Sequence, residues 1–176
     1  MAQLNAAKAE RAPVSTTDNH FETYSAEFAD NTTLPSLSII LLATTVVEAQ
    51  TMAILPAPLT LAVESDNPDA ANIIETYRAA GGEAVLLLPT DGPNFLGKGG
   101  DPANIPGQLN AILANSDGVI GILDGPEGKL NQDNRMLEGI YAKLTKTGHA
   151  MITVDGLGLN RASIMARESG IPATGI

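Results

Sequence analysis

From residue 59 onward, short apolar runs alternate with stretches whose apolar residues recur at helical spacing. The runs predict strands over residues 59–64, 83–88, 118–123, 150–154 and 171–176. The intervening stretches predict helices over residues 105–114, 130–147 and 161–168, and one that starts at Asn67-Pro68 and stops at Gly81-Gly82. This alternation predicts a Rossmann-like, doubly wound α/β fold with a mainly parallel sheet and helices on both faces.

The first part of the chain has a different pattern. We expect residues 1–35 to form an N-terminal arm with a short amphipathic helix, and residues 36–176 to form the α/β domain. Phe21, Tyr24 and Phe28 are spaced three and four apart, so a helix would place the three rings on one face. That face packs either on its own domain or on a neighbouring subunit, and the second alternative predicts a homo-oligomer.

Residues 37–47 and 52–55 are apolar and rich in Thr, which indicates two extended segments. They form either a strand pair added to the sheet or a hairpin used in assembly, and the pattern does not decide between the two. The longer segment is too short to span a bilayer, so we expect no membrane partner and a cytoplasmic location.

Composition narrows the possible functions. Ten basic and twenty acidic residues among 176 give a net charge of −10, which disfavours binding to nucleic acid. The chain has no Cys, which excludes thiolate metal sites and cysteine nucleophiles. The two histidines, His20 and His149, are far apart in sequence and have no carboxylate at ligand spacing. We therefore expect neither a metal site nor catalysis by histidine.

Parallel α/β sheets bind ligands at the carboxyl ends of their strands. In this sequence those ends lie near Ser65, Thr90, Asp124 and Asp155. Asp124 follows a continuous apolar strand and is itself followed by a glycine and a proline.

Residues 116–142 combine this strand, ending in Leu-Asp-Gly, with a helix that carries the letters EGIYA at positions 138–142. The window resembles the nucleoside 2-deoxyribosyltransferase family, whose members show Leu-Asp-Gly and then Glu-Ile-Gly-Tyr-Ala. The resemblance extends over about residues 59–154. It implies that Glu138 is a nucleophile that attacks the anomeric carbon of a deoxyribose and holds the sugar as an ester until a second base arrives.

The same resemblance implies roles for the neighbouring polar groups. Asp124 or Asp133 would protonate the departing base, and Tyr141 would orient the nucleophile. The substrate, a small nucleoside, would contact Asp91, Gln108 and Ser65. No metal or organic cofactor would take part.

Three observations support an alternative in which the chain is a non-catalytic structural or assembly subunit that oligomerises through its arm. Glu64 and Asp66 place charges where a sugar would lie, the stretch before Glu138 lacks an expected glycine, and the aromatic residues of the arm suit an interface. A solvated helix face would equally account for Asp133 and Glu138. A weaker resemblance, over residues 160–176, is to the mobile domain of phosphoenolpyruvate-utilising enzymes, with Arg161 in place of the phosphorylated histidine.

Overall fold

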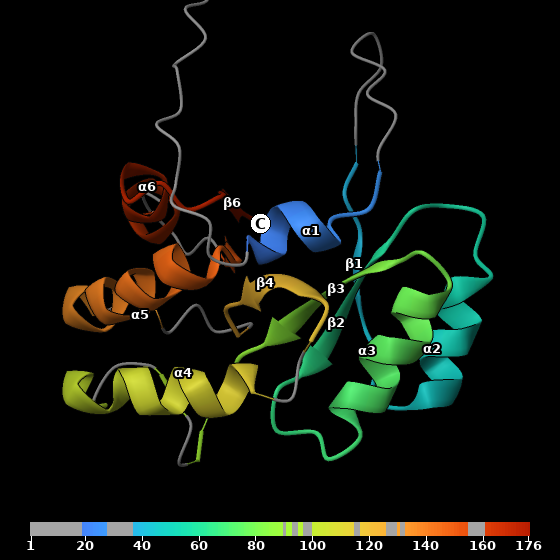
Figure 1. The fold of residues 1–176 in the computed structure, drawn as a ribbon, viewed down its shortest axis with the longest axis horizontal. Coiled ribbons are helices and arrows are strands. Elements are labelled where there is room, and N and C mark those ends of the chain that lie inside the picture. The colour runs from blue at the N-terminus through green and yellow to red at the C-terminus, as the bar shows by residue number, and fades with distance from the viewer. Residues whose placement is uncertain are drawn as a thin grey trace, which may run out of the picture.

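The structure is a computed structural model that describes residues 19–27, 37–89, 91–92, 95–96, 100–114, 117–125, 130, 133–154 and 161–176. Its centre is a curled sheet of six parallel strands, which confirms the predicted α/β fold of the doubly wound type (Figure 1). The strands are β1 (Ile40–Leu42), β2 (Thr60–Glu64), β3 (Glu83–Leu87), β4 (Val119–Leu123), β5 (Ala150–Thr153) and β6 (Ala173–Gly175). They lie side by side in chain order, from β1 at one edge to β6 at the other.

The helices described are α1 (His20–Tyr24), α2 (Val46–Ala53), α3 (Ala70–Ala79), α4 (Ile105–Leu113), α5 (Asn134–Thr147) and α6 (Arg161–Glu168). A short 3-10 turn, η1 (Pro102–Asn104), leads into α4. The predicted helices and strands from residue 59 onward are confirmed, with some ends moved by a few residues. The largest shift is at α5, which begins after Asp133 because that side chain caps its first turn.

Helices lie on both faces of the sheet, as predicted, but unequally. The larger apolar cluster packs one face of the sheet against α2, α3, α4, α5 and α6. This is expected for parallel strands in chain order, because right-handed crossovers then place each connecting helix on the same side. The second face carries the smaller cluster of Ala62, Val85, Ile120 and Leu123, against which α1 packs.

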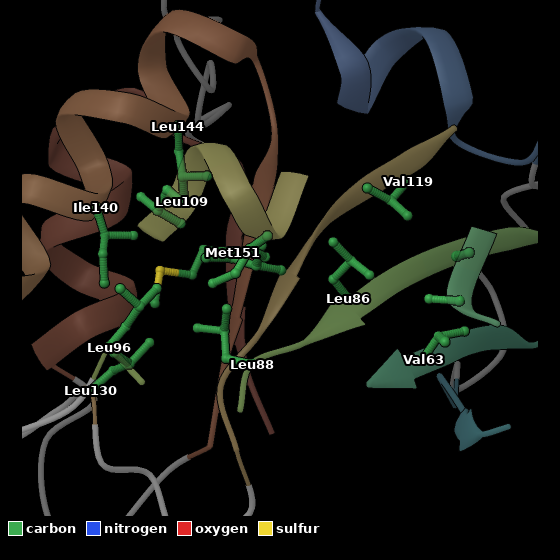
Figure 2. Close-up of a cluster of buried hydrophobic side chains, with 14 of the residues drawn as sticks. Val63, Leu86, Leu88, Leu96, Leu109, Val119, Leu130, Ile140, Leu144 and Met151 are labelled. Carbon is green, nitrogen blue, oxygen red and sulfur yellow. The ribbon is translucent and has the colours of Figure 1, made fainter. Parts of the chain in front are cut away.

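The larger cluster forms the core that fixes the strands in place. Figure 2 shows Leu109 of α4 and Ile140 and Leu144 of α5 pointing toward the sheet residues Leu88 and Met151. All five of these side chains are buried. Strand β4 runs through the middle of this packing and is buried along its whole length, as expected for a strand covered on both faces.

Helix α1 packs on its own domain, which was one of the two alternatives for the aromatic residues. Phe21 and Tyr24 are half-buried against the second face of the sheet. The N–H of Phe21 donates to the carbonyl of Gly148 at 2.9 Å, and the Arg78 side chain donates to the carbonyl of Tyr24. Phe28 lies outside the described residues, and an oligomer formed through the three rings stays a prediction, as does the boundary at residue 35.

The segment after β1 differs from the expectation. Residues 40–42 form β1, a strand added to the edge of the sheet, as one alternative predicted, but residues 46–53 form the helix α2, so the second extended segment and the strand pair or hairpin are wrong. Thr45 and Glu48 make a reciprocal capping box in which Oε2 of Glu48 accepts the N–H of Thr45 at 3.1 Å. This cap starts the helix despite the β-branched residues that follow it. None of the helices in the described part of the chain has the length and apolar character needed to cross a bilayer.

Candidate functional site

Asp124 is the carboxylate that lies at the carboxyl end of strand β4, where parallel sheets bind their ligands. It directly follows β4, and its N–H donates to the carbonyl of Ile152 on β5 at 2.8 Å. This bond continues the β4–β5 ladder by one residue beyond the strand and fixes the backbone from which the side chain projects. The residue is only 3% exposed, which is unusual for an aspartate.

A glycine allows β4 to approach β5 closely enough for this arrangement. A Cβ atom at Gly121 would lie 2.3 Å from the carbonyl oxygen of Ala150, which is well inside a normal van der Waals contact. The sequence VIGIL of β4 therefore combines a continuous apolar surface with one position that must be glycine. Asp124 is positioned at the end of this closely packed pair of strands.

Burial governs the electrostatics of Asp124. It raises the pKa of the carboxyl group from its ordinary 3.8 to about 6, although the backbone N–H groups of Gly125 and Leu130 act in the opposite direction. One oxygen, Oδ2, is fully buried and has no hydrogen-bond partner within the described residues. A buried carboxylate oxygen without a donor is destabilised in its charged form, and it remains available to accept a proton.

Tyr141 is close enough to sense the charge of Asp124. Its pKa is raised by burial and, secondarily, by that carboxylate. The phenol therefore stays protonated, and its O–H donates to the carbonyl of Ala162 on α6 at 2.6 Å. Tyr141 thus joins α5 to α6 beside Asp124, a placement that differs from the predicted role of orienting Glu138.

Glu138 lies on α5 one turn before Tyr141 but is exposed. The buried residues of this helix are Met136, Leu137, Ile140, Tyr141 and Leu144. Glu138 lies beside this buried face and is exposed, in contrast to the buried Asp124 and Tyr141. Asp133 is half-buried and accepts the N–H groups of Arg135 and Met136 as the cap of α5, at 3.0 and 3.4 Å.

The three predicted substrate contacts are spread over different parts of the molecule. Ser65, after β2, is half-buried, and its Oγ is fully buried without a partner in the described part of the chain. It lines an open groove of about 1110 Å³ between α3 and α4, whose lining does not include Asp124. Asp91 is exposed, and the side chain of Gln108 donates to the carbonyl of Phe95 at 3.4 Å. Thr90 and Asp155 lie outside the described residues.

The two histidines lie together, a contact that their positions in the sequence do not predict. Their rings stack with centroids 4.1 Å apart, because α1 brings His20 over His149 just before β5. Burial, followed by the charges of His20 and Lys143, lowers the pKa of His149 to about 3. Their spacing in the sequence could not reveal this contact, which depends on the docking of α1. Across the described ranges, no three His, Cys, Asp or Glu side chains form a group that could hold a metal ion.

Comparison with known proteins decides which family this fold represents. A family model described as divergent polysaccharide deacetylase matches residues 43–175, which include every described strand except β1. The chain belongs to the divergent polysaccharide deacetylase family. The resemblance to nucleoside 2-deoxyribosyltransferases is therefore wrong, and so are the transferase function and the role of Glu138 that depended on it. The match also covers most of residues 160–176 and gives no support to the phosphoenolpyruvate-related interpretation.

A solved structure supports the fold of this deacetylase family member. The uncharacterized protein ATU2773 from Agrobacterium tumefaciens superimposes with a TM-score of 0.71 at 17% sequence identity. The alignment covers 89% of this chain and 68% of that one. No curated protein sequence matches the chain. Neither comparison supports the alternative of a non-catalytic assembly subunit, which we also withdraw.

Proposed function

We propose that this protein removes acetyl groups from a carbohydrate by hydrolysis, with Asp124 as the general base. The observation that carries the proposal is a buried carboxyl group with a pKa of about 6 and one unpaired oxygen, at the ligand-binding edge of a parallel sheet. The family description supplies the substrate class, an acetylated polysaccharide or oligosaccharide. With this pKa most of the carboxyl groups are ionised at pH 7, so the base form predominates.

The proposed reaction needs one water molecule and one proton shuttle. The Asp124 carboxylate takes a proton from water, and the oxygen of that water forms a bond to the carbonyl carbon of the acetyl group. The tetrahedral intermediate then breaks its bond to the sugar nitrogen or oxygen, which receives the proton back from Asp124. The products are acetic acid, which loses its proton to solvent and becomes acetate, and the free amino or hydroxyl group of the sugar, and Asp124 returns to its ionised form.

Metal-bound water is another way to attack an acetyl group, and such sites take three histidine or carboxylate ligands. The side chains that the structure describes do not fit this requirement, because no such group of three is present among them. His149, the more buried imidazole, precedes the amino end of β5, whereas Asp124 follows the carboxyl end of the neighbouring β4. No step of the proposed mechanism passes through a metal ion.

The burial of Asp124 has a kinetic consequence. Because the residue is almost inaccessible, the substrate reaches the carboxyl group only when the groups covering it move apart. We therefore expect the opening of the site, and not the chemical step, to limit turnover. A cytoplasmic location stays a prediction, which fractionation of cells that express the tagged chain would test.

Acetate release is the direct test. The full chain would be incubated with N-acetylated chito-oligosaccharides and with O-acetylated xylo-oligosaccharides, and free acetate would be measured. We expect release from at least one substrate, and we expect Asp124→Asn to reduce it about 100- to 10,000-fold, the usual contribution of a general base. Glu168→Gln, the same chemical change at an exposed position on α6, serves as the matched control and should retain full activity.

Two results would contradict the proposal. One is the absence of acetate release from both substrates by folded wild-type protein. The other is an Asp124→Asn variant that releases acetate as fast as the Glu168→Gln control.

A further inference from the structure

Exposed apolar side chains gather at one end of the sheet. Of the eight large hydrophobic residues found exposed in the described part of the chain, six lie within residues 37–55. Leu37 and Ile54 are each 83% exposed, and Val47 on α2 is 69% exposed. We call the surface formed by β1, α2 and the residues next to them, 37–55, the edge face. Such a concentration of apolar surface marks an interaction site more often than chance exposure does.

The edge face also has backbone groups without partners. Strand β1 pairs with β2 on one side, where the carbonyl of Ile39 accepts the N–H of Thr60 and the N–H of Ala43 donates to Ala62. Alternate residues of a strand direct their backbone groups to opposite sides. The N–H and C=O groups of Ile40 and Leu42 therefore point to the outer side, where no described residue pairs with them. An open strand edge of this kind is a template for a further strand.

The low charge of the edge face indicates which kind of partner it can bind. Residues 37–63 contain a single charged residue, Glu48, in a chain whose net charge is −10. Oε2 of Glu48 is already engaged by the N–H and Oγ1 of Thr44, at 2.7 and 2.9 Å. Two copies of an acidic protein repel each other over most of their surfaces. The edge face is where two copies can approach with the least repulsion.

We propose that the edge face is the interface between two copies of this chain in solution. A two-fold axis beside β1 would place the β1 strands of the two copies antiparallel, so that their outward N–H and C=O groups hydrogen-bond to each other. The same axis would bring the two α2 helices close together. The proposal concerns a surface far along the sheet from Asp124 and is independent of the acetyl hydrolase function. It also differs from an assembly through the aromatic residues of α1, which pack on their own sheet.

Sedimentation velocity over a range of protein concentrations tests the proposal. We expect a dimer in the wild-type chain, and we expect Val47→Lys combined with Ile54→Lys to weaken it at least about 100-fold, because each new charge meets its own copy across the axis. Ile164→Lys on α6, at an exposed apolar position near the other end of the sheet, is the matched control and should leave the dimer unchanged. A wild-type monomer at all concentrations, or a dimer that survives the double substitution, overturns the proposal.

Cross-linking provides a second measurement in case the double variant does not fold. The natural chain has no cysteine, so Gln50→Cys on the exposed side of α2 introduces the only thiol. A short bis-maleimide should link two copies of this variant, and it should not link copies of Ser169→Cys, which carries its thiol next to α6. Linking at position 169 with none at position 50 contradicts the edge face as the interface.

Discussion

Asp124 and His149 are both buried titratable residues, and they lie at opposite ends of the neighbouring strands β4 and β5. Each is 3% exposed, and burial is the main cause of the altered pKa in both. Their surroundings differ. Nδ1 of His149 lies 2.8 Å from Oγ1 of Thr147 and its ring is covered by His20, whereas Asp124 keeps an oxygen without a partner among the described groups. Burial with a closed set of partners makes a structural residue, and burial with an open acceptor makes a candidate for chemistry.

The two residues affect stability in opposite directions with pH. The pKa of Asp124 is raised in the folded protein, from 3.8 to about 6, so the free energy of unfolding falls as pH rises through that window. The pKa of His149 is lowered, from 6.5 to about 3, so stability is lost as pH falls below 6.5. Between pH 7.5 and 4 the two effects largely offset each other in the wild-type chain. Removing either group should therefore leave the pH dependence of stability that the other group causes without compensation.

The larger of the two effects on stability is expected from His149→Gln. Between pH 7.5 and 4 the wild-type chain loses about 3 kcal/mol through the protonation of this histidine in the unfolded state alone. The variant should lose about that much less over the same interval. Urea unfolding at several pH values measures how the free energy of unfolding changes with pH in the variant and in the wild-type chain. The substitution also removes the ring stacking with His20, but that loss is the same at every pH and cancels in the comparison. A variant with the same pH dependence as the wild-type chain would show that His149 is not buried in its neutral form.

A smaller effect of opposite sign is expected from Asp124→Asn. The ionised carboxylate destabilises the fold above pH 6, so the stability of the variant relative to the wild type should rise by about 2 kcal/mol between pH 4 and 7.5. The same urea series provides the measurement, with Glu168→Gln as the exposed control, for which we expect no such trend. A relative stability that stays level over this range would contradict the raised pKa.

The smallest effect is expected from Tyr141→Phe. It removes the hydrogen bond to the carbonyl of Ala162 and should lower the free energy of unfolding by about 1 kcal/mol. Tyr77→Phe is a matched control, because that hydroxyl also donates to a buried carbonyl, of Leu59 at 2.8 Å. If the two variants lose the same stability but only Tyr141→Phe releases acetate more slowly, Tyr141 acts at the reacting centre. Equal acetate release by the two variants would limit Tyr141 to joining α5 and α6.

Local patterns predicted most of the fold from residue 59 onward. Glycine and proline end the elements clearly there, and the apolar spacing distinguishes helix from strand. They failed at α2, where β-branched and apolar residues resemble a strand. The signal that could have corrected this was Thr45 followed three residues later by Glu48, the sequence of a capping box.

The candidate site was predictable only in part. The position of Asp124 after an apolar strand indicated the ligand-binding edge, but its burial depends on packing between segments far apart in the chain. Glu138 was assigned a catalytic role from a family resemblance that the comparisons overturn, and it is exposed whereas Tyr141 is buried. The contact between His20 and His149 depends on the docking of α1, which no local pattern encodes.

One paired measurement tests the central claim that Asp124 is retained for chemistry at the expense of stability. Acetate release would be measured at pH 7.5, and urea unfolding at pH 4 and at pH 7.5, on the same preparations of wild-type protein and Asp124→Asn. We expect acetate release to fall at least about 100-fold while the stability of the variant, relative to the wild type, is higher than at pH 4. A variant that releases acetate at the wild-type rate, or that loses activity only because it unfolds, would contradict the claim.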